Sequence, residues 1–549
     1  MNCDVLVYGG TAAGVIAAVT AARRGKSVLL VEPGRHLGGM TSGGLGWTDF
    51  GNKDAIGGLA RRFYVRVGDH YEHTLGTRQF TEQGVHAHNA KGWAEAPPAE
   101  DGACFVFEPG VAEQILEAML AEAGDAVRVV REHRVDATEV RDGRIVSVRF
   151  DHAPSGEFNE PGDDVLGHLD VEPRFCLDCT YEGDLFAEAG CSFRVGREGN
   201  DVYGETLNGI PARTVKHQLS VPVDPYVRPG EPDSGLIPLV QSGDLGTPGD
   251  GDDSVQAYNF RLCLTRRDDL RVDWTDRPAP DYDPARYELM RRFVRAVDEH
   301  GGGTALAAHL IISDLPNAKT DINNKGGVST DFIGQNHAYP TAGYAERGRI
   351  WREHVAYQWG LFQFLATADD LPKREHLRDE ARALGLCRDE FTDTRGWPHQ
   401  LYVREARRLL GREVMTQHHP VGDKLVDDSV GLAAYTMDSH NCRRLAIDRL
   451  AKNEGDVQVP PTDPYPISYG AMLPRDGATR NLLVPVCVSA SHIAFGSIRM
   501  EPVFMVLGES ASLAACACLD GDVPADELPY DRLRALLDEA HQALAWPAT

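Results

Sequence analysis

The sequence predicts an α/β fold in which a mixed α+β domain interrupts a domain built on a parallel sheet. First, an apolar run at 4–8 leads through a glycine-rich turn into an alanine-rich helix over 12–22, and a second apolar run ends at Glu32. Second, residues 201–470 differ in character, with frequent prolines, aromatics and histidines. Third, the chain returns to apolar strands and small-residue helices after residue 470. These alternations predict one domain split by another.

The first turn reads Gly9-Gly10-Thr11-Ala12-Ala13-Gly14 and is typical of Rossmann-like dinucleotide-binding domains. Its glycines let the backbone turn sharply and bring a helix N-terminus, with its partial positive charge, up to a pyrophosphate. Glu32 lies eighteen residues after Gly14, where a carboxylate accepts hydrogen bonds from a ribose. A strict G-x-G-x-x-G has glycine where this chain has Thr11, so we expect Gly10 to supply the close approach. This segment predicts dinucleotide binding.

A second glycine-rich segment follows directly and runs from Pro33 through His36, Gly38, Gly39, Met40 and Thr41 to Gly43 and Gly44. Such a density of glycine indicates a backbone that lies close to a bulky ligand. The next elements follow from hydrophobic periodicity and turn residues. They are helices over 54–68 and 111–123, strands over 127–130 and from 135, a hairpin turn at 141–144, a loop over 151–170, a strand near 173–180 and a helix through Ala189.

The middle region reads as a separate substrate-facing domain with mixed elements: a strand over 255–262 and helices over 349–365 and 401–410. In the returning part we expect a buried strand over 481–486, a glycine-serine turn at Gly496-Ser497 and a small-residue helix over 502–518. The predicted organisation is therefore a nucleotide-binding domain in 1–200 and 471–525, a substrate domain in 201–470 and a C-terminal helix in 526–549.

Composition excludes some classes of partner. The chain carries 56 basic and 82 acidic residues, a formal net charge of −26, which repels phosphate backbones and anionic lipid. No run approaches the roughly 18 apolar residues that span a bilayer, and residues 1–3 lead straight into the first strand without room for a signal peptide. The eleven cysteines, Cys176 and Cys179 included, read as buried free thiols rather than disulfides or metal ligands. We expect a cytoplasmic protein without nucleic-acid, membrane or metal partners, and leave its oligomeric state open.

Five motifs, in order over residues 4 to about 520, resemble a family of bacterial FAD-dependent oxidoreductases of the glutathione-reductase/fumarate-reductase structural type. Some members carry the label xanthan lyase. The motifs are Gly9-Gly-Thr-Ala-Ala-Gly14, His36-Leu-Gly-Gly-Met-Thr-Ser-Gly-Gly44, Asp178-Cys-Thr-Tyr-Glu-Gly-Asp184, Asp321-Ile-Asn-Asn324 and Ser491-His-Ile-Ala-Phe-Gly-Ser-Ile-Arg499. Thr11 and Cys179 depart from the family pattern, and a second glycine turn for NAD(P)H is not evident.

The resemblance implies FAD as the cofactor. The first glycines would hold its pyrophosphate, Glu32 its ribose, and Gly38, Gly39 and Gly43 the path towards the flavin. The helix after Gly496 would point its N-terminus at the flavin N1/O2 edge, helped by the Arg499 cation. His36 holds the place of a histidine that links FAD covalently in some relatives. The implied FAD-binding set is Gly9, Gly10, Thr11, Ala12, Ala13, Gly14, Glu32, Pro33, His36, Gly38, Gly39, Met40, Thr41, Gly43, Gly44, Ser497, Arg499 and Met500.

The reaction is predicted from polar side chains in loop-like stretches. Hydride transfer from an alcohol needs a base such as His for the hydroxyl proton, whereas dehydrogenation beside a carboxylate needs Arg or His anchors. The candidates are His492, His440, Asn441, His337 and Arg404. Core packing for His492, a solvated loop for His440 and a salt-bridged helix face for Arg404 are the structural alternatives.

We predict an FAD-dependent oxidoreductase that takes a hydride from a sugar, glycoside or polyol to flavin N5 and passes electrons to an unidentified acceptor. The many Asn, Asp, His, Tyr and Trp residues of the middle domain suggest this polar small-molecule substrate. Three alternatives stay open at this point: a CH–CH dehydrogenase or reductase acting on a carboxylate substrate, a polysaccharide lyase, and a non-catalytic or nucleic-acid-modifying flavoprotein.

Overall fold

The computed structural model describes residues 1–76, 101–475 and 479–547. Its central element is a seven-stranded sheet in the order β3-β2-β1-β6-β5-β4, with β20 paired to β6. Strands β1, β2, β3, β6 and β20 run parallel, whereas β4 and β5 form an antiparallel hairpin joined to β6. The strand bounds are β1 Asn2–Tyr8, β2 Val28–Val31, β3 Val127–Val130, β4 His133–Arg141, β5 Arg144–His152, β6 Gly167–Asp178 and β20 Leu482–Leu483.

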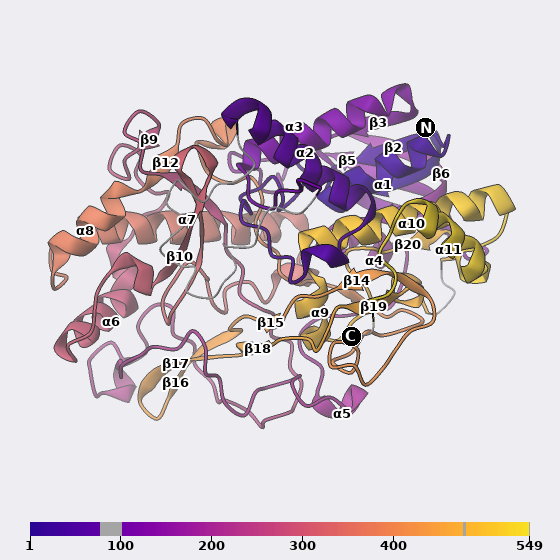
Figure 1. Cartoon of the computed structure of the whole chain (residues 1–549). Helices are drawn as coiled ribbons and strands as arrows, with labels where there is room; N and C mark the ends of the chain where they lie inside the picture. The colour runs from indigo at the N-terminus through magenta and orange to yellow at the C-terminus, as the bar shows by residue number, and fades with distance from the viewer. Residues whose placement is uncertain (77–100, 476–478, 548–549) are drawn as a thin grey trace.

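Alternation along β1 explains how the sheet buries both faces. Val5 and Val7 point to the cluster formed with the helices, whereas Leu6 and Tyr8 pack with Phe150 of the β4–β5 hairpin. The helices on the first face are α1 (Ala12–Arg23), α2 (Gly58–Leu75), α3 (Pro109–Glu122) and α10 (Glu501–Gly521), as Figure 1 shows. This arrangement brings the first and last parts of the chain into one domain.

Helix α10 packs on α1 through small residues. A Cβ on Gly508 would lie 2.4 Å from the Ala13 carbonyl oxygen, and Ser512 Oγ donates to the Ala17 carbonyl at 2.7 Å. The expectation that no run approaches a membrane-spanning length is wrong for α10, which is long and apolar enough by composition. Its most apolar window is, however, 94% buried inside the protein, so its hydrophobicity serves a core helix.

The middle region forms a five-stranded antiparallel sheet in the order β10-β11-β8-β12-β9, covered by the long helix α7 (Figure 1). The helices here are α5 (Asn200–Tyr203), α6 (Glu288–Glu299), α7 (Tyr344–Thr367) and α8 (Arg374–Ala383). The sheet strands are β8 Leu262–Thr265, β9 Arg271–Val272, β10 Leu310–Leu315, β11 Lys319–Asn324 and β12 Gly385–Cys387. Four two-stranded pairs complete it: β7 (Phe193–Arg194) with β13 (Arg408–Leu409), β14 (Ser429–Ala433) with β19 (Tyr465–Ser468), β15 (Met437–Ser439) with β18 (Val457–Val459), and β16 (Arg443–Ile447) with β17 (Leu450–Glu454).

The helix predicted over 401–410 is wrong. The segment is extended and contains only the short strand β13. Its backbone also bonds to distant segments: Tyr402 N–H donates to the Asn259 carbonyl at 2.8 Å, and Leu409 N–H to the Cys487 carbonyl at 2.9 Å. Tertiary pairing therefore overrides the helical periodicity.

The turn predicted at Gly496-Ser497 is also wrong, because both residues lie inside α9 (His492–Ile498), whose N-cap Ser491 accepts from Ala494 N–H. The strand predicted over 255–262 begins only at Leu262. The loop predicted over 151–170 is shorter, since β6 already begins at Gly167. The helix predicted over 54–68 is α2, which begins at Gly58 and runs on to Leu75. The C-terminal helix predicted within 526–549 is the shorter α11 (Tyr530–Glu539), and the buried strand over 481–486 shrinks to β20. The remaining main elements lie near their predicted positions.

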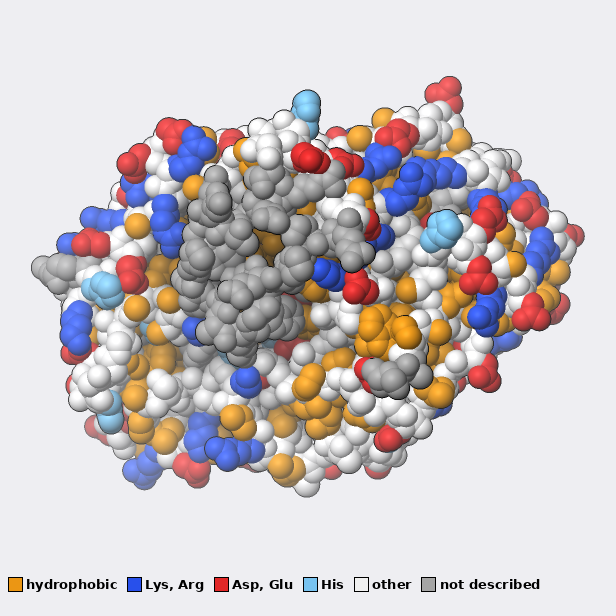
Figure 2. Space-filling model, viewed as in Figure 1, with side chains coloured by type: hydrophobic (Ala, Val, Ile, Leu, Met, Phe, Trp, Pro, Cys, Tyr) orange, Lys and Arg blue, Asp and Glu red, His pale blue; other side chains and the backbone are white. Residues whose placement is uncertain are grey.

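All eleven cysteines are buried and free, as predicted. Cys176 and Cys179 lie at the end of β6 and just beyond it, and burial raises the pKa of both thiols well above their usual value. On the face shown in Figure 2, Lys and Arg side chains alternate with Asp and Glu rather than gathering in one patch.

Candidate active site

The glycine turn after β1 is closed by backbone contacts that leave no room for side chains. Gly9 has φ +96°, and a Cβ on Gly14 would lie 1.9 Å from the Gly9 carbonyl oxygen. Thr11 is the N-cap of α1: its hydroxyl accepts from Gly14 N–H and donates to the Cys179 carbonyl at 2.8 Å. Thr11 therefore replaces the expected glycine without disturbing the helix start.

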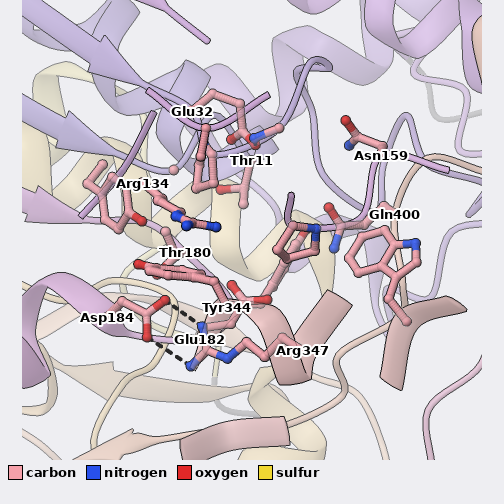
Figure 3. Close-up of a pocket in the computed structure, with 18 of the residues that line it drawn as sticks. Thr11, Glu32, Arg134, Asn159, Thr180, Glu182, Asp184, Tyr344, Arg347 and Gln400 are labelled. Atoms are coloured by element: carbon pink, nitrogen blue, oxygen red, sulfur yellow. Dashed lines mark hydrogen bonds and ion pairs between the residues drawn. The ribbon is translucent and has the colours of Figure 1, made fainter. Parts of the chain in front are cut away.

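A cleft of about 700 Å³ lies at the carboxyl ends of β1 and β2, where parallel sheets of this kind bind nucleotides. Figure 3 shows Glu32 and Thr11 on one side of it and the Arg347–Asp184 ion pair, at 2.6 Å, on the other. Gly9 and Pro33 also line the cleft. The predicted pyrophosphate and ribose positions thus share one cavity.

Glu32 is half-buried at the tip of β2. Its two carboxylate oxygens accept from Gly10 N–H and Gly34 N–H, each at 2.6 Å. Burial raises the pKa of Glu32 to about 7, although these two backbone donors lower it. The carboxyl group is therefore held at the glycine turn, where a ribose hydroxyl would meet it.

The second glycine segment packs against residues of the middle region. A Cβ on Gly43 would lie 2.3 Å from Gln400 Cβ, and one on Gly44, with φ +122°, would lie 2.0 Å from the Arg261 carbonyl oxygen. Gly38 and Gly39 also have positive φ. Only glycine permits this approach, so the segment forms a close seam with the middle region of the chain.

The N-terminus of α10 contacts the second glycine segment through Glu501, a residue that the sequence did not indicate as part of the site. Glu501 is buried in the first turn of α10 and accepts from Tyr181 OH at 2.6 Å and Thr41 Oγ1 at 2.8 Å, while Tyr181 OH accepts from Met40 N–H at 2.9 Å. Burial raises the pKa of Glu501 to about 7, partly offset by these two hydroxyls.

A Glu501→Gln variant is expected to lose less stability with rising pH. The pKa of Glu501 is raised from 4.5 to about 7, so between these pH values the folded state holds a proton on Glu501 that the unfolded state has lost. The contribution of Glu501 to the free energy of unfolding is therefore fully present below about pH 4.5 and is lost as the pH rises through 7. The difference corresponds to on the order of 3 kcal/mol. Urea unfolding from pH 4.5 to 8 measures it, with the exposed Glu188→Gln as control. Parallel curves for wild type and Glu501→Gln would contradict the assignment.

The strongest titratable cluster centres on His440, which follows β15. Its Nδ1 lies 3.1 Å from Asp331 Oδ2 and its Nε2 3.2 Å from Asp438 Oδ2. Burial and the Arg404 guanidinium lower the pKa of His440, but the two carboxylates outweigh them and raise it above its ordinary value. The imidazole is therefore a buried acid–base group rather than part of a solvated loop.

Two arginines bind the same carboxylates. Arg404 Nη2 lies 2.9 Å from Asp331 Oδ1, and Arg499 Nη2 donates to Asp438 Oδ2 at 3.1 Å. Both guanidinium groups lie near the Tyr402 ring, whose hydroxyl accepts from Arg499 Nη1 at 2.8 Å. Among the described residues, the Nε of Arg404 and of Arg499 has no hydrogen-bond partner. Arg404 thus lies in this core cluster and not on a helix face.

The remaining catalytic candidates lie around the cluster. His492 is buried, with Nδ1 2.8 Å from Glu405 Oε2 and Nε2 2.8 Å from Ser439 Oγ, so it supports the residue before His440. Asn441 donates to the His217 carbonyl at 3.5 Å. His337 Nε2 lies 2.9 Å from the Cys442 carbonyl oxygen. Asp321 forms a bidentate pair with Arg261 at 2.8 and 2.7 Å.

Three FAD-binding candidates have other contacts. Ser497, inside α9, donates to the Tyr435 carbonyl and accepts from Tyr465. Met500 is the N-cap of α10. His36 lies 3.1 Å from Glu113 and 2.9 Å from Asp393 and stacks on His399 with centroids 3.9 Å apart. Covalent attachment through His36 remains a prediction.

Sequence reasoning missed several residues of the site: Asp331, Asp438, Tyr402, Arg261 and Glu501. Asp438 stands two residues before His440, which is the one local signal available. The others come from distant segments, so only the fold brings them together.

The parallel sheet, the glycine turn and the cleft define a dinucleotide-binding protein of the Rossmann type. The family model described as FAD dependent oxidoreductase matches residues 4–537, and the chain belongs to this family. The protein is therefore an enzyme with FAD as its cofactor. No curated protein matches the chain.

Solved flavoenzymes share only low overall likeness. The myxobacterial chondrochloren halogenase CndH is 11% identical over 98% of this chain and 78% of its own, with a TM-score of 0.34. OxyS anhydrotetracycline hydroxylase from Streptomyces rimosus is 14% identical over 40% of this chain and 41% of its own, with a TM-score of 0.24. The 3-ketosteroid-delta4-(5alpha)-dehydrogenase from Rhodococcus jostii RHA1 is 18% identical over 32% and 45%, with a TM-score of 0.19. These similarities say nothing about the reaction of this enzyme. The chain spans about two fifths of the length of the hydroxylase.

The residues present fit FAD at both ends. The turn at Gly9 and Gly14 leaves room only for backbone, and Glu32 faces the cleft. At the other end, the seam at Gly43 and Gly44 adjoins Arg261, and the unpartnered Nε of Arg499 offers a buried donor to an acceptor-rich ring edge.

Proposed function

We propose that this enzyme oxidises a CH–OH group of a polar small molecule, such as a sugar, glycoside or polyol. FAD supplies the hydride acceptor. The observation that carries the proposal is buried His440, held between Asp331 and Asp438. Alcohol oxidation releases a hydroxyl proton, and a histidine between fixed carboxylates is a suitable group to exchange it.

The protein groups divide the proton chemistry between them. Asp331, at Nδ1 of His440, orients the imidazole ring and stabilises its protonated form. Asp438 also accepts a hydrogen bond from Arg499, so it can keep that bond when a substrate hydroxyl replaces it at Nε2 of His440. Because the pKa of His440 is raised, Nε2 becomes a proton acceptor only on the alkaline side of that pKa. We therefore expect oxidation to accelerate with rising pH.

Anaerobic bleaching of the flavin tests this function. Purified holoenzyme mixed with glycerol, mannitol or methyl α-glucoside is expected to lose its visible flavin absorbance, which an electron acceptor such as O₂ then restores. Acid precipitation of the same sample reports whether the flavin is released or held by His36. Protein that dithionite bleaches but no hydroxylated compound bleaches would refute the proposal.

A second candidate is CH–CH dehydrogenation or reduction of a carboxylate compound. The buried, unpartnered Nε atoms of Arg404 and Arg499 favour it, because guanidinium groups bind carboxylates well. Bleaching by succinate, or reoxidation of the dithionite-reduced flavin by fumarate, would support this candidate over the first. The polysaccharide-lyase alternative needs no redox flavin, and membership of an oxidoreductase family favours the two redox candidates over it.

A further inference from the structure

A second cavity lies in the substrate domain and shares no lining residue with the nucleotide cleft. It is an open cavity of about 1100 Å³ between the segment 206–216, the start of α5, the turn at 248–249 and residues 456–458. Its lining mixes apolar and polar residues. The lining residues with amide, hydroxyl or charged side chains are Asn200, Thr206, Asn208, Arg213, Lys216, Asp456 and Gln458.

Asp456 is the unusual member of this lining. The residue is 4% exposed, and neither carboxylate oxygen has a hydrogen-bond partner in the part of the chain that the structure describes. A buried carboxyl group without partners costs free energy unless another group binds it. A ligand in the cavity would supply the hydrogen-bond donors that these two oxygens lack.

Asp456 also connects the cavity to the catalytic cluster. His217 Nε2 lies 4.0 Å from Asp456 Oδ2, and the His217 carbonyl accepts from Asn441, the neighbour of His440. Burial raises the pKa of Asp456 to about 7, and the charges of His440, Asp438 and Asp331 act on it. A molecule in the cavity would therefore be connected to His440 through His217 and Asn441.

We propose that this cavity is a substrate subsite for an uncharged, hydroxyl-rich group, with Asp456 receiving a pair of hydroxyls. A carboxylate has acceptor positions for two neighbouring hydroxyl groups, and amides and hydroxyls complete their hydrogen bonds. An organic cation fits less well, because Arg213 and Lys216 line the same cavity. The inference rests on the proposed function in one respect: the bound compound is the one whose CH–OH group reacts.

Binding measured apart from turnover tests the subsite. Isothermal titration of FAD-loaded protein with methyl α-glucoside and with maltose gives the dissociation constants, and anaerobic bleaching is followed separately. In Asp456→Leu the acceptor is removed, and in Ala212→Trp a large side chain is added at an exposed lining residue while Asp456 is kept. Asp463→Leu makes the same chemical change on an exposed carboxylate and is the control.

Both cavity variants are expected to weaken glucoside or maltose binding at least about tenfold, while the control binds like wild type. Asp456→Leu should fold, because an apolar residue replaces a buried acid that has no hydrogen-bond partner among the described residues. If Asp456→Leu protein does not fold, Ala212→Trp still tests the cavity. Equal binding by wild type and both cavity variants, or no binding by wild type, would overturn the subsite. Binding that both variants lose, without any bleaching, would instead refute the oxidation and leave the subsite standing.

Discussion

A Gly14→Val variant is expected to be purified without FAD. A Cβ at this position would lie 1.9 Å from the Gly9 carbonyl oxygen, so the turn cannot close at the N-terminus of α1. The pyrophosphate would then lose the backbone donors and the helix dipole together. We expect affinity to fall by at least about a hundredfold, which is about 2.7 kcal/mol. The ratio of visible flavin absorbance to protein absorbance measures the result.

Two comparisons separate this effect from misfolding. Gly303→Val makes the same change at an exposed glycine with open space around its Cβ position, and should stay fully loaded. Glu32→Gln keeps the turn intact but replaces the carboxylate at the ribose position, so it should weaken FAD binding with an unchanged circular dichroism spectrum. Gly14→Val protein as yellow as wild type would place the cofactor elsewhere.

His440→Asn is expected to slow flavin reduction by the substrate by about 10²- to 10⁴-fold, the usual range for loss of an acid–base group. FAD content should not change, because His440 contacts Asp331 and Asp438 and not the glycine turn. Single-turnover reduction under anaerobic conditions gives the rate directly. His337→Asn is the matched control, since His337 Nε2 bonds only to the Cys442 carbonyl among the described contacts. Equal rates in the two variants would remove His440 from the mechanism.

The pH profile distinguishes a proton-exchanging role from a structural one. Asp438→Asn removes a carboxylate that raises the pKa of His440, so that pKa falls and the acidic limb of the oxidation profile moves to lower pH. Reduction rates measured from pH 5 to 9 give the limb in wild type and variant. An unmoved limb would assign it to another group. The charged and titratable groups that act on or near His440 are Asp331, Asp438, Asp456, His217, Arg404 and Arg499.

The failed helix over 401–410 marks the limit of local patterns. Its periodicity favoured a helix, yet Arg404, Glu405 and Arg408 are all buried in charge pairs with Asp331, His492 and Glu198. Forming these pairs needs an extended backbone, and no window of the sequence contains both partners. Glu501 could not be predicted for the same reason, because its partners Thr41 and Tyr181 lie more than three hundred positions away in the sequence.

The sequence by itself determined the start of the nucleotide domain. The strand, glycine turn, helix and Glu32 are specified by steric limits and periodicity over about thirty residues, which act locally. Only the tertiary structure decided the surroundings of His440. It placed Asp331, Arg404, Asp438, His440 and Arg499 in one buried cluster, because charges removed from water are stable only when paired with opposite charges, wherever the chain supplies them.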